Sequence, residues 1–222
     1  MSHSVHPYAH RLGILRDWKS RWFGKRGKYQ EYLKADVLLR EYLERRLRGF
    51  YVDVIEFERG QNLFNIIIRT ARPGMVIGRS GEGAQKLRAD IIKEMYRLKV
   101  NIPQNIKINI EEIREPEKHS RIVASMIAEG LEKRLPFRRV MKQTLEKMMA
   151  NRSVLGAKIA LSGRLGGAEM GRFEYLKEGQ IPLQTLRADI DFAREKAHLP
   201  YGDIGIKVWI YRGEVFEKKK KS

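Results

Sequence analysis

Two kinds of hydrophobic repeat alternate along the first half of this chain, and their order restricts the folds it can adopt. Apolar residues spaced three and four apart indicate helices, whereas β-branched runs and strict alternation indicate strands. Pro73 suits the first turn of a short helix, and a longer amphipathic helix follows Gly81. The predicted order is αββααβ, a compact two-layer α+β domain. The corresponding segments are 29–48, 51–59, 63–70, 73–77, 82–98 and 105–113.

The pattern changes beyond Glu115-Pro116-Glu117, which marks a domain boundary. Two helices and four strand-like segments follow, and they predict a second two-layer α+β domain with a mostly antiparallel sheet. The helices are expected at 118–134 and 137–151, and the strands at 154–162, 169–178, 186–196 and 203–212. The expected parts of the chain are a basic arm (1–28), the αββααβ domain (29–115), the C-terminal domain (116–213) and a basic tail (214–222).

The charge of the chain is far from balanced. Its 222 residues contain 45 Lys and Arg against 27 Asp and Glu, which gives a net charge of +18. Such an excess predicts a polyanionic partner, either a nucleic acid or an anionic membrane surface. No apolar run in the sequence approaches the ~20 residues of a membrane span, so we expect no membrane protein.

The two ends of the chain contribute much of this charge. The arm contains seven basic residues and one acidic residue, together with Trp18, Trp22 and Phe23. Large aromatic side chains favour burial, so we expect the arm to pack on its own domain or on a partner. Lys218–Lys221 form either a solvated tail or a segment that contacts nucleic acid.

Two glycines three residues apart join the helices of the first domain, in Gly78-Arg79-Ser80-Gly81. Glycine lets a phosphate approach the backbone closely, and the following helix presents free N–H groups with a partial positive charge. A bare G-x-x-G mostly marks a turn, but this one follows two strands and separates a short helix from a long one. That context is typical of a KH-type clamp for single-stranded nucleic acid. A nucleotide-hydrolysing loop would need four residues between its glycines.

A basic cluster begins the second helix of the C-terminal domain. Arg138 and Lys142 are four residues apart and Arg139 and Lys142 are three apart, so all three share one helix flank. Cations near a helix N-terminus oppose the helix dipole, and like charges repel, which favours a bound anion over a merely solvated face.

The segment Ser162–Gly167 contains Arg164 and is either a plain hairpin loop or a loop that contacts phosphate.

No catalytic constellation stands out in the sequence. The absence of cysteine excludes disulfides, thiol catalysis and Cys-ligated zinc, and neither G-x-S-x-G nor H-E-x-x-H occurs. The three histidines of the arm give no firm metal site. Asp189 and Asp191 share a strand face, but Arg187 can pair with Asp189, so we do not expect a catalytic dyad. We expect no enzyme activity, no metal or cofactor and no small-molecule substrate.

These motifs together resemble the universal S-three family of bacterial small-subunit ribosomal proteins, over nearly the whole chain from Val5 to Gly213. The resemblance rests on Val5-His6-Pro7 with Arg11-Leu12-Gly13, Thr70–Gly74 running into Val76–Gly78 and Gly81-Glu82, Phe137-Arg138-Arg139 with Met141-Lys142, Ser162–Glu169, and Leu186–Asp191 with Gly205–Ile210.

This resemblance implies a type II KH domain followed by a C-terminal α+β domain, in a protein of the cytoplasmic ribosome. It implies binding to small-subunit rRNA in the head of the subunit, beside ribosomal proteins S-ten and S-fourteen, without homo-oligomerisation. Phosphate contacts are expected from Gly78, Arg79, Ser80, Gly81, Arg11 and Arg164. It also implies a place at the channel by which mRNA enters. There Arg138, Arg139 and Lys142 would hold the message and unwind it passively, without nucleotide hydrolysis.

Two other classes of protein share some of these features. A free-standing KH regulator of RNA would explain the G-x-x-G loop and the charge, but it explains the aromatic basic arm and the 162–169 loop less well. A nuclease or lyase would need a carboxylate cluster or an activated lysine, and the sequence offers no convincing candidate for either.

Overall fold

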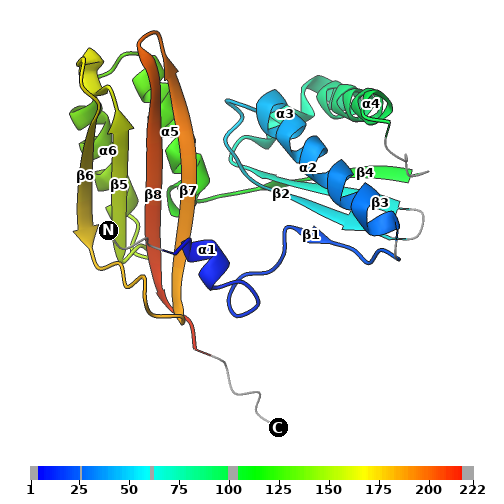
Figure 1. The fold of residues 1–222 in the computed structure, drawn as a ribbon, viewed down its shortest axis with the longest axis horizontal. Coiled ribbons are helices and arrows are strands. Elements are labelled where there is room, and N and C mark those ends of the chain that lie inside the picture. The colour runs from blue at the N-terminus through cyan, green and yellow to red at the C-terminus, as the bar shows by residue number, and fades with distance from the viewer. Residues whose placement is uncertain (1–4, 26, 61–62, 100–104, 217–222) are drawn as a thin grey trace. The chain divides into compact units, whose positions relative to one another are not determined.

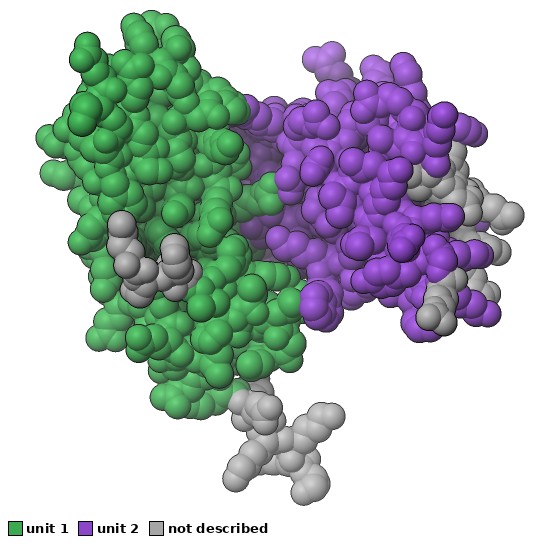
Figure 2. Space-filling view, viewed as in Figure 1, with its two compact units in different colours: residues 1–17, 115–222 green, residues 18–114 purple. Residues whose placement is uncertain are grey.

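The structure is a computed structural model that describes residues 5–25, 27–60, 63–99 and 105–216. The chain divides into two units, one of residues 18–114 and one of residues 1–17 with 115–222 (Figure 2). Each unit is a sheet covered by helices, so the predicted α+β class is confirmed (Figure 1). The arm is not one segment, because its first part belongs to the C-terminal unit and its second part to the αββααβ unit.

The 18–114 unit has the predicted αββααβ order with one added strand from the arm. Its four strands lie in the order β1-β2-β3-β4, with β2 and β3 antiparallel and the other two pairs parallel. The elements are β1 (Ser20–Arg21), α2 (Lys28–Arg46), β2 (Val52–Arg59), β3 (Leu63–Thr70), α3 (Pro73–Ile77), the 3₁₀ turn η1 (Arg79–Gly81), α4 (Glu82–Arg97) and β4 (Asn105–Glu112).

The core of this unit follows from the apolar strand β3. Phe64, Ile66 and Ile68 are fully buried, and they belong to one cluster with Leu39 of α2 and Ile91 of α4. The alternation of β3 therefore directs one set of side chains towards the two helices. This packing fixes α4, and with it the loop that precedes α4.

The second part of the arm is held by a buried ion pair of the same unit. The indole Nε1 of Trp22 donates to Asp36 Oδ2 at 2.7 Å, while an Nη of Arg59 lies 2.5 Å from Asp36 Oδ1. The Arg59 guanidinium also lies 4.1 Å from the centre of the Phe64 ring. Asp36 and Arg59 are almost completely buried, and each neutralises the charge of the other. Burial of either charge alone would be costly. Trp22 thus packs on its own unit, whereas Trp18 and Phe23 are exposed.

The C-terminal unit has the two helices and the four-stranded sheet that the sequence predicts. The strand order is β6-β5-β8-β7, and every pair is antiparallel. The elements are α1 (Pro7–His10), the 3₁₀ turn η2 (Pro116–Lys118), α5 (Ser120–Glu132), α6 (Phe137–Met149), β5 (Gly156–Gly163), the 3₁₀ turn η3 (Leu165–Gly167), β6 (Arg172–Gly179), β7 (Ala188–Leu199) and β8 (Gly202–Glu214). Helices α5 and α6 cover one face of the sheet (Figure 1). Lys218–Lys221 lie outside the described residues.

Arg11 fixes the first part of the arm to this unit, which corrects the expectation that it contacts phosphate. Its side chain is fully buried. Nε donates to the carbonyl of Ala188 at 2.6 Å, and the Nη groups donate to those of Pro7 at 3.1 Å, Leu183 at 3.0 Å and Thr185 at 2.9 Å. Burial lowers the pKa of the guanidinium. Because its donors end on backbone carbonyls, no face of Arg11 remains for RNA.

Asp189 and Asp191 are likewise structural. An Nη of Arg16 lies 2.6 Å from Asp189, and an Nη of Arg212 lies 3.0 Å from Asp191. Asp191 also accepts the backbone N–H of Ser120 at 2.8 Å and so caps the start of α5. Burial alone would raise the pKa of Asp191, but Arg212, Arg16 and Ser120 outweigh it and lower that pKa. These contacts join the arm, α5, β7 and β8.

None of the helices in the described part of the chain combines the length and the apolar character that a membrane span requires.

Candidate nucleic-acid interface

The Gly78–Gly81 loop reverses the chain between α3 and α4 in a backbone conformation that favours glycine. Gly78 has φ 71° and Gly81 has φ 83°, and Ser80 between them also has a positive φ of 52°. A Cβ on Gly78 would lie 2.9 Å from the backbone nitrogen of Gly83, which is closer than real Cβ contacts. The two predicted glycines are therefore both required by the backbone.

A third glycine completes the loop, and the sequence reasoning missed its role. A Cβ on Gly83 would lie 2.6 Å from the carbonyl oxygen of Val76 and 2.8 Å from that of Ile77. The first turn of α4 thus packs directly against the backbone of α3. The signal was present in the sequence, because a glycine within a helix costs ~1 kcal/mol relative to alanine and points to a close approach.

The side chains around this loop combine charge with exposed apolar surface. Arg79 and Ser80 are exposed, and Gly81 provides no side-chain cap for the first N–H groups of α4. On α3, Met75 is 52% exposed, and just before α3 the exposed Arg72 lies with its guanidinium 4.4 Å from the centre of the Tyr51 ring. Such a loop can accept a phosphate on backbone N–H groups and Arg79, with apolar surface beside it for a base.

The predicted basic cluster lies at the start of α6. Arg138, Arg139 and Lys142 are all exposed. An Nη of Arg138, whose side chain is 71% exposed, lies 3.3 Å from Glu174 of β6. Within the described part of the chain, Arg139 and Lys142 have no ion-pair partner. The fold therefore brings all three cations together and leaves at least two of them available for a phosphate.

The Ser162–Gly167 loop joins β5 to β6 as a hairpin and lies beside the first turn of α6. A Cβ on Gly166, whose φ is 69°, would lie 3.9 Å from the Phe137 ring. Arg164 is half-buried, and its Nε donates to the carbonyl of Ala168 at 2.8 Å. An Nη of Arg164 donates to the carbonyl of Tyr201 at 3.4 Å. Arg164 thus shapes the loop with part of its guanidinium.

These features define a class of protein. A glycine loop between two helices on an αββααβ core is the architecture of a KH-type RNA-binding protein, and a second α+β unit with a basic helix accompanies it here. The family comparisons agree with this class. Residues 38–118 match the KH domain family, and residues 127–210 match the family described as ribosomal protein S3, C-terminal domain.

Curated relatives extend this match over the whole chain. The chain is 47% identical to the small ribosomal subunit protein uS3 of Pseudomonas aeruginosa over 215 residues, which cover 97% of the chain and 91% of the relative. It is 46% identical to that of Syntrophomonas wolfei over 224 residues, which cover 99% and 93%. The chain belongs to the uS3 family of small ribosomal subunit proteins. It is a structural protein of the bacterial cytoplasmic ribosome and not an enzyme.

Proposed function

We propose that the Gly78–Gly81 loop binds small-subunit rRNA in the head of the subunit and that the α6 cluster contacts mRNA where it enters. Arg138, Arg139 and Lys142 define the α6 cluster. The observation that carries the mRNA contact is the exposure of all three cations on one helix flank, two of them with no ion-pair partner in the described residues. Ribosomal proteins S-ten and S-fourteen are the proposed protein neighbours, on the family resemblance.

The loop supplies the rRNA contact chiefly through its backbone. The N–H groups at the start of α4 carry the partial positive charge of the helix dipole, and Arg79 adds a full charge beside them. Arg164 lies on a different unit and contributes through the part of its guanidinium that does not hold the loop. Arg11 is not part of this set because its side chain is buried.

Unwinding by the α6 cluster is passive in this proposal. Cations that bind the phosphates of the incoming single strand hold that strand away from its complement. Each base pair that translocation opens is therefore less able to reform. The ribosome supplies the work by pulling the message. The chain itself needs no nucleotide and no hydrolysis.

The test is translation through a message that contains a stable hairpin, in ribosomes with Arg138→Ala/Arg139→Ala/Lys142→Ala. We expect normal assembly, normal rates on an unstructured message and slower rates through the hairpin. The salt dependence of single-strand binding should become shallower by a slope of about 2, because three contacts of about 0.7 each are lost.

The matched control is Lys34→Ala/Lys93→Ala/Lys99→Ala, which removes the same charge from exposed positions on α2, on α4 and just after α4. Its hairpin rates should equal those of the wild type. Normal hairpin rates in the α6 variant would contradict the mRNA contact. Loss of assembly in that variant would show that the cluster contacts rRNA instead.

A further inference from the structure

The face of the C-terminal sheet opposite α5 and α6 carries an ordered arrangement of aromatic and basic side chains. Trp209 alternates with the buried Val208 and Ile210, and Lys158 alternates with the buried Ala157 and Ile159, so Trp209 and Lys158 point away from the helices. The strand register places three rows across this outer face. They are Lys177, Lys158, Trp209 and Phe192; Tyr175, Ala160, Lys207 and Arg194; and Phe173, Ser162, Gly205 and Lys196.

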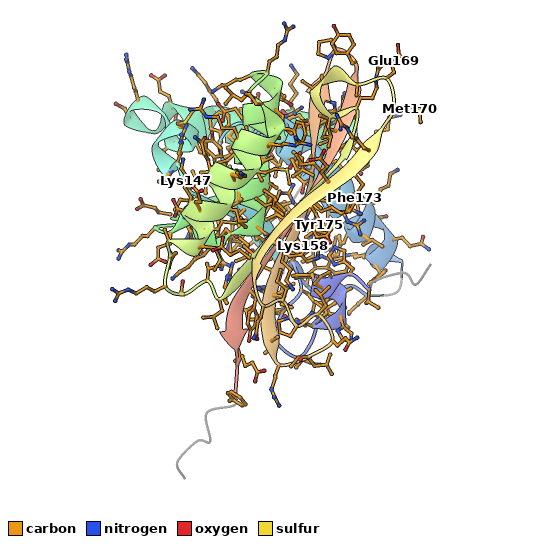
Figure 3. The ribbon with its side chains drawn as sticks, turned by 90° about the vertical axis from the view of Figure 1, so that its left-hand side faces the viewer. Lys147, Lys158, Glu169, Met170, Phe173 and Tyr175 are labelled. Atoms are coloured by element: carbon orange, nitrogen blue, oxygen red, sulfur yellow. The ribbon has the colours of Figure 1, made fainter. Side chains whose placement is uncertain are left out.

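The aromatic residues of the edge strand β6 are open to solvent. Phe173 and Tyr175 are each 57% exposed, and their ring centres lie 5.9 Å apart. The Nζ of Lys158 lies 4.8 Å from the centre of the Tyr175 ring and 5.1 Å from that of Trp209, so one cation links the two rings. Figure 3 shows Lys158, Tyr175 and Phe173 following one another towards the loop that carries Met170.

The part of the arm that the structure describes, from residue 5 onward, covers one end of this face. The His6 ring packs edge-on against Phe192 of β7 at 4.8 Å, and Phe192 lies 5.0 Å from Trp209. Beyond Trp209, the small residues Ala160, Ser162 and Gly205 separate the exposed aromatics of β6 from the cations of β7 and β8. The area beyond the described part of the arm therefore has aromatic rings on one side and positive charge on the other.

The charges of the three rows point to the kind of partner. The rows contain five cations and no carboxylate, and Lys158 lies opposite Lys177 while Arg194 lies opposite Lys207. Like charges directly opposite each other on a sheet destabilise it, and a polyanion would relieve this repulsion. The nearest acid of the outer face, Asp203 in the next row, is engaged by His198 at 2.6 Å.

We propose that this outer face binds single-stranded RNA, with bases stacked on Phe173 and Tyr175 and phosphates held by the lysines of β5 and β8. Exposed aromatics on a sheet that is flanked by cations are the means by which single strands are bound without sequence preference. A protein surface would have to supply several carboxylates against five cations, whereas RNA supplies one charge per nucleotide. The α6 cluster lies on the other side of the sheet, because Arg138 contacts Glu174 on the helix-facing side of β6. The site is thus separate from the proposed mRNA contact.

The test uses the full chain with the other proposed RNA contacts removed. A failure of the outer-face proposal can then be distinguished from a failure of the contacts proposed for the Gly78–Gly81 loop and the α6 cluster. The background contains Arg79→Asp/Ser80→Asp and Arg138→Ala/Arg139→Ala/Lys142→Ala. In it, Phe173→Ala/Tyr175→Ala should weaken the binding of a single-stranded oligouridine about tenfold or more, since stacking on each ring contributes substantially. Binding of duplex RNA should change little.

Matched controls replace side chains of the same kind elsewhere. Tyr96→Ala removes an exposed aromatic of α4, and Lys147→Gln removes a cation on the helix side of the sheet (Figure 3). Both should bind oligouridine as the background does. Lys158→Gln/Lys207→Gln leaves the rings in place and should weaken oligouridine binding and its salt dependence. Thermal unfolding of every variant shows whether it is folded.

Ultraviolet cross-linking of assembled subunits identifies what lies on the face. A cross-link from Phe173 or Tyr175 to RNA supports the proposal. A cross-link to another ribosomal protein, or unchanged oligouridine binding in folded Phe173→Ala/Tyr175→Ala, would overturn it. An equal loss of duplex binding would also overturn it, because a duplex cannot stack its bases on the rings.

Discussion

The two units fix their candidate RNA-binding elements by different means. In the 18–114 unit, backbone packs on backbone, since Gly83 of α4 lies directly on the carbonyls of Val76 and Ile77. In the C-terminal unit, buried side chains join distant segments, with Arg11 bound to backbone carbonyls near β7 and Asp191 bound to Arg212 and to the start of α5. A loop that binds phosphate through its own N–H groups needs a backbone without obstructing side chains. A helix or sheet that binds through side chains needs only to be held rigidly in its own unit.

Each unit contains cations that are paired with carboxylates and cations that are not. In the 18–114 unit many cations are already neutralised, as in the contacts of Arg69 with Glu56 at 3.0 Å and Glu111 at 2.8 Å, and these partners raise the pKa of Arg69. In the C-terminal unit Arg187 is paired with Glu214, whereas Arg139 and Lys142 have no ion-pair partner among the described residues. A net charge of +18 therefore does not by itself locate a binding site.

Removal of Arg11 should have the largest effect on stability. Arg11→Ala leaves several buried carbonyls without a donor, so we expect the free energy of unfolding of the C-terminal unit to fall by about 4 kcal/mol. Hydrogen exchange should show the loss in β7 and little change in β3. Arg187→Ala removes an exposed pair with Glu214 and should cost at most about 1 kcal/mol. Equal losses of stability in the two variants would contradict the structural role assigned to Arg11.

A side chain at Gly83 tests the backbone packing of the other unit. Gly83→Val should destabilise the 18–114 unit by about 3 kcal/mol, because its Cβ has no space against α3. The protection of β7 against exchange should stay as in the wild type. Gly74→Ala is the control, since nothing lies within 4 Å of its Cβ, and it should be neutral or slightly stabilising. A neutral Gly83→Val would mean that α3 and α4 are not in contact.

Low pH should destabilise the C-terminal unit, by a smaller amount than the Arg11 and Gly83 substitutions destabilise their units. The folded state lowers the pKa of Asp191 below its ordinary value of 3.8. The Asp191 carboxylate therefore makes its full contribution to the free energy of unfolding above that pH. The contribution is lost as the pH falls through the folded pKa. Asp191→Asn should cost about 2 kcal/mol at neutral pH, and the difference from wild type should shrink below pH 3.8. A difference that is the same at every pH would exclude this role for the Asp191 carboxylate.

The sequence predicted the elements well, because periodicity depends on local burial. It also placed the loop and the α6 cluster, since spacings of three and four fix which residues share a helix face. It missed the contacts between residues far apart in the chain. Arg11 looks like any basic residue of an arm until β7 is seen to bury it, and the opposition of Lys158 and Lys177 depends on strand register, which spacing does not fix.

The central claim is that this chain acts as a firmly bound part of the small subunit. Sedimentation of the tagged protein from a bacterial lysate, at physiological salt and again at high salt, tests that claim most directly. We expect stoichiometric migration with the small subunit that persists at high salt, because a protein built into the assembled subunit is also held by contacts that salt does not screen. Migration as free protein, or release at modest salt, would contradict the claim and favour a free-standing KH regulator of RNA.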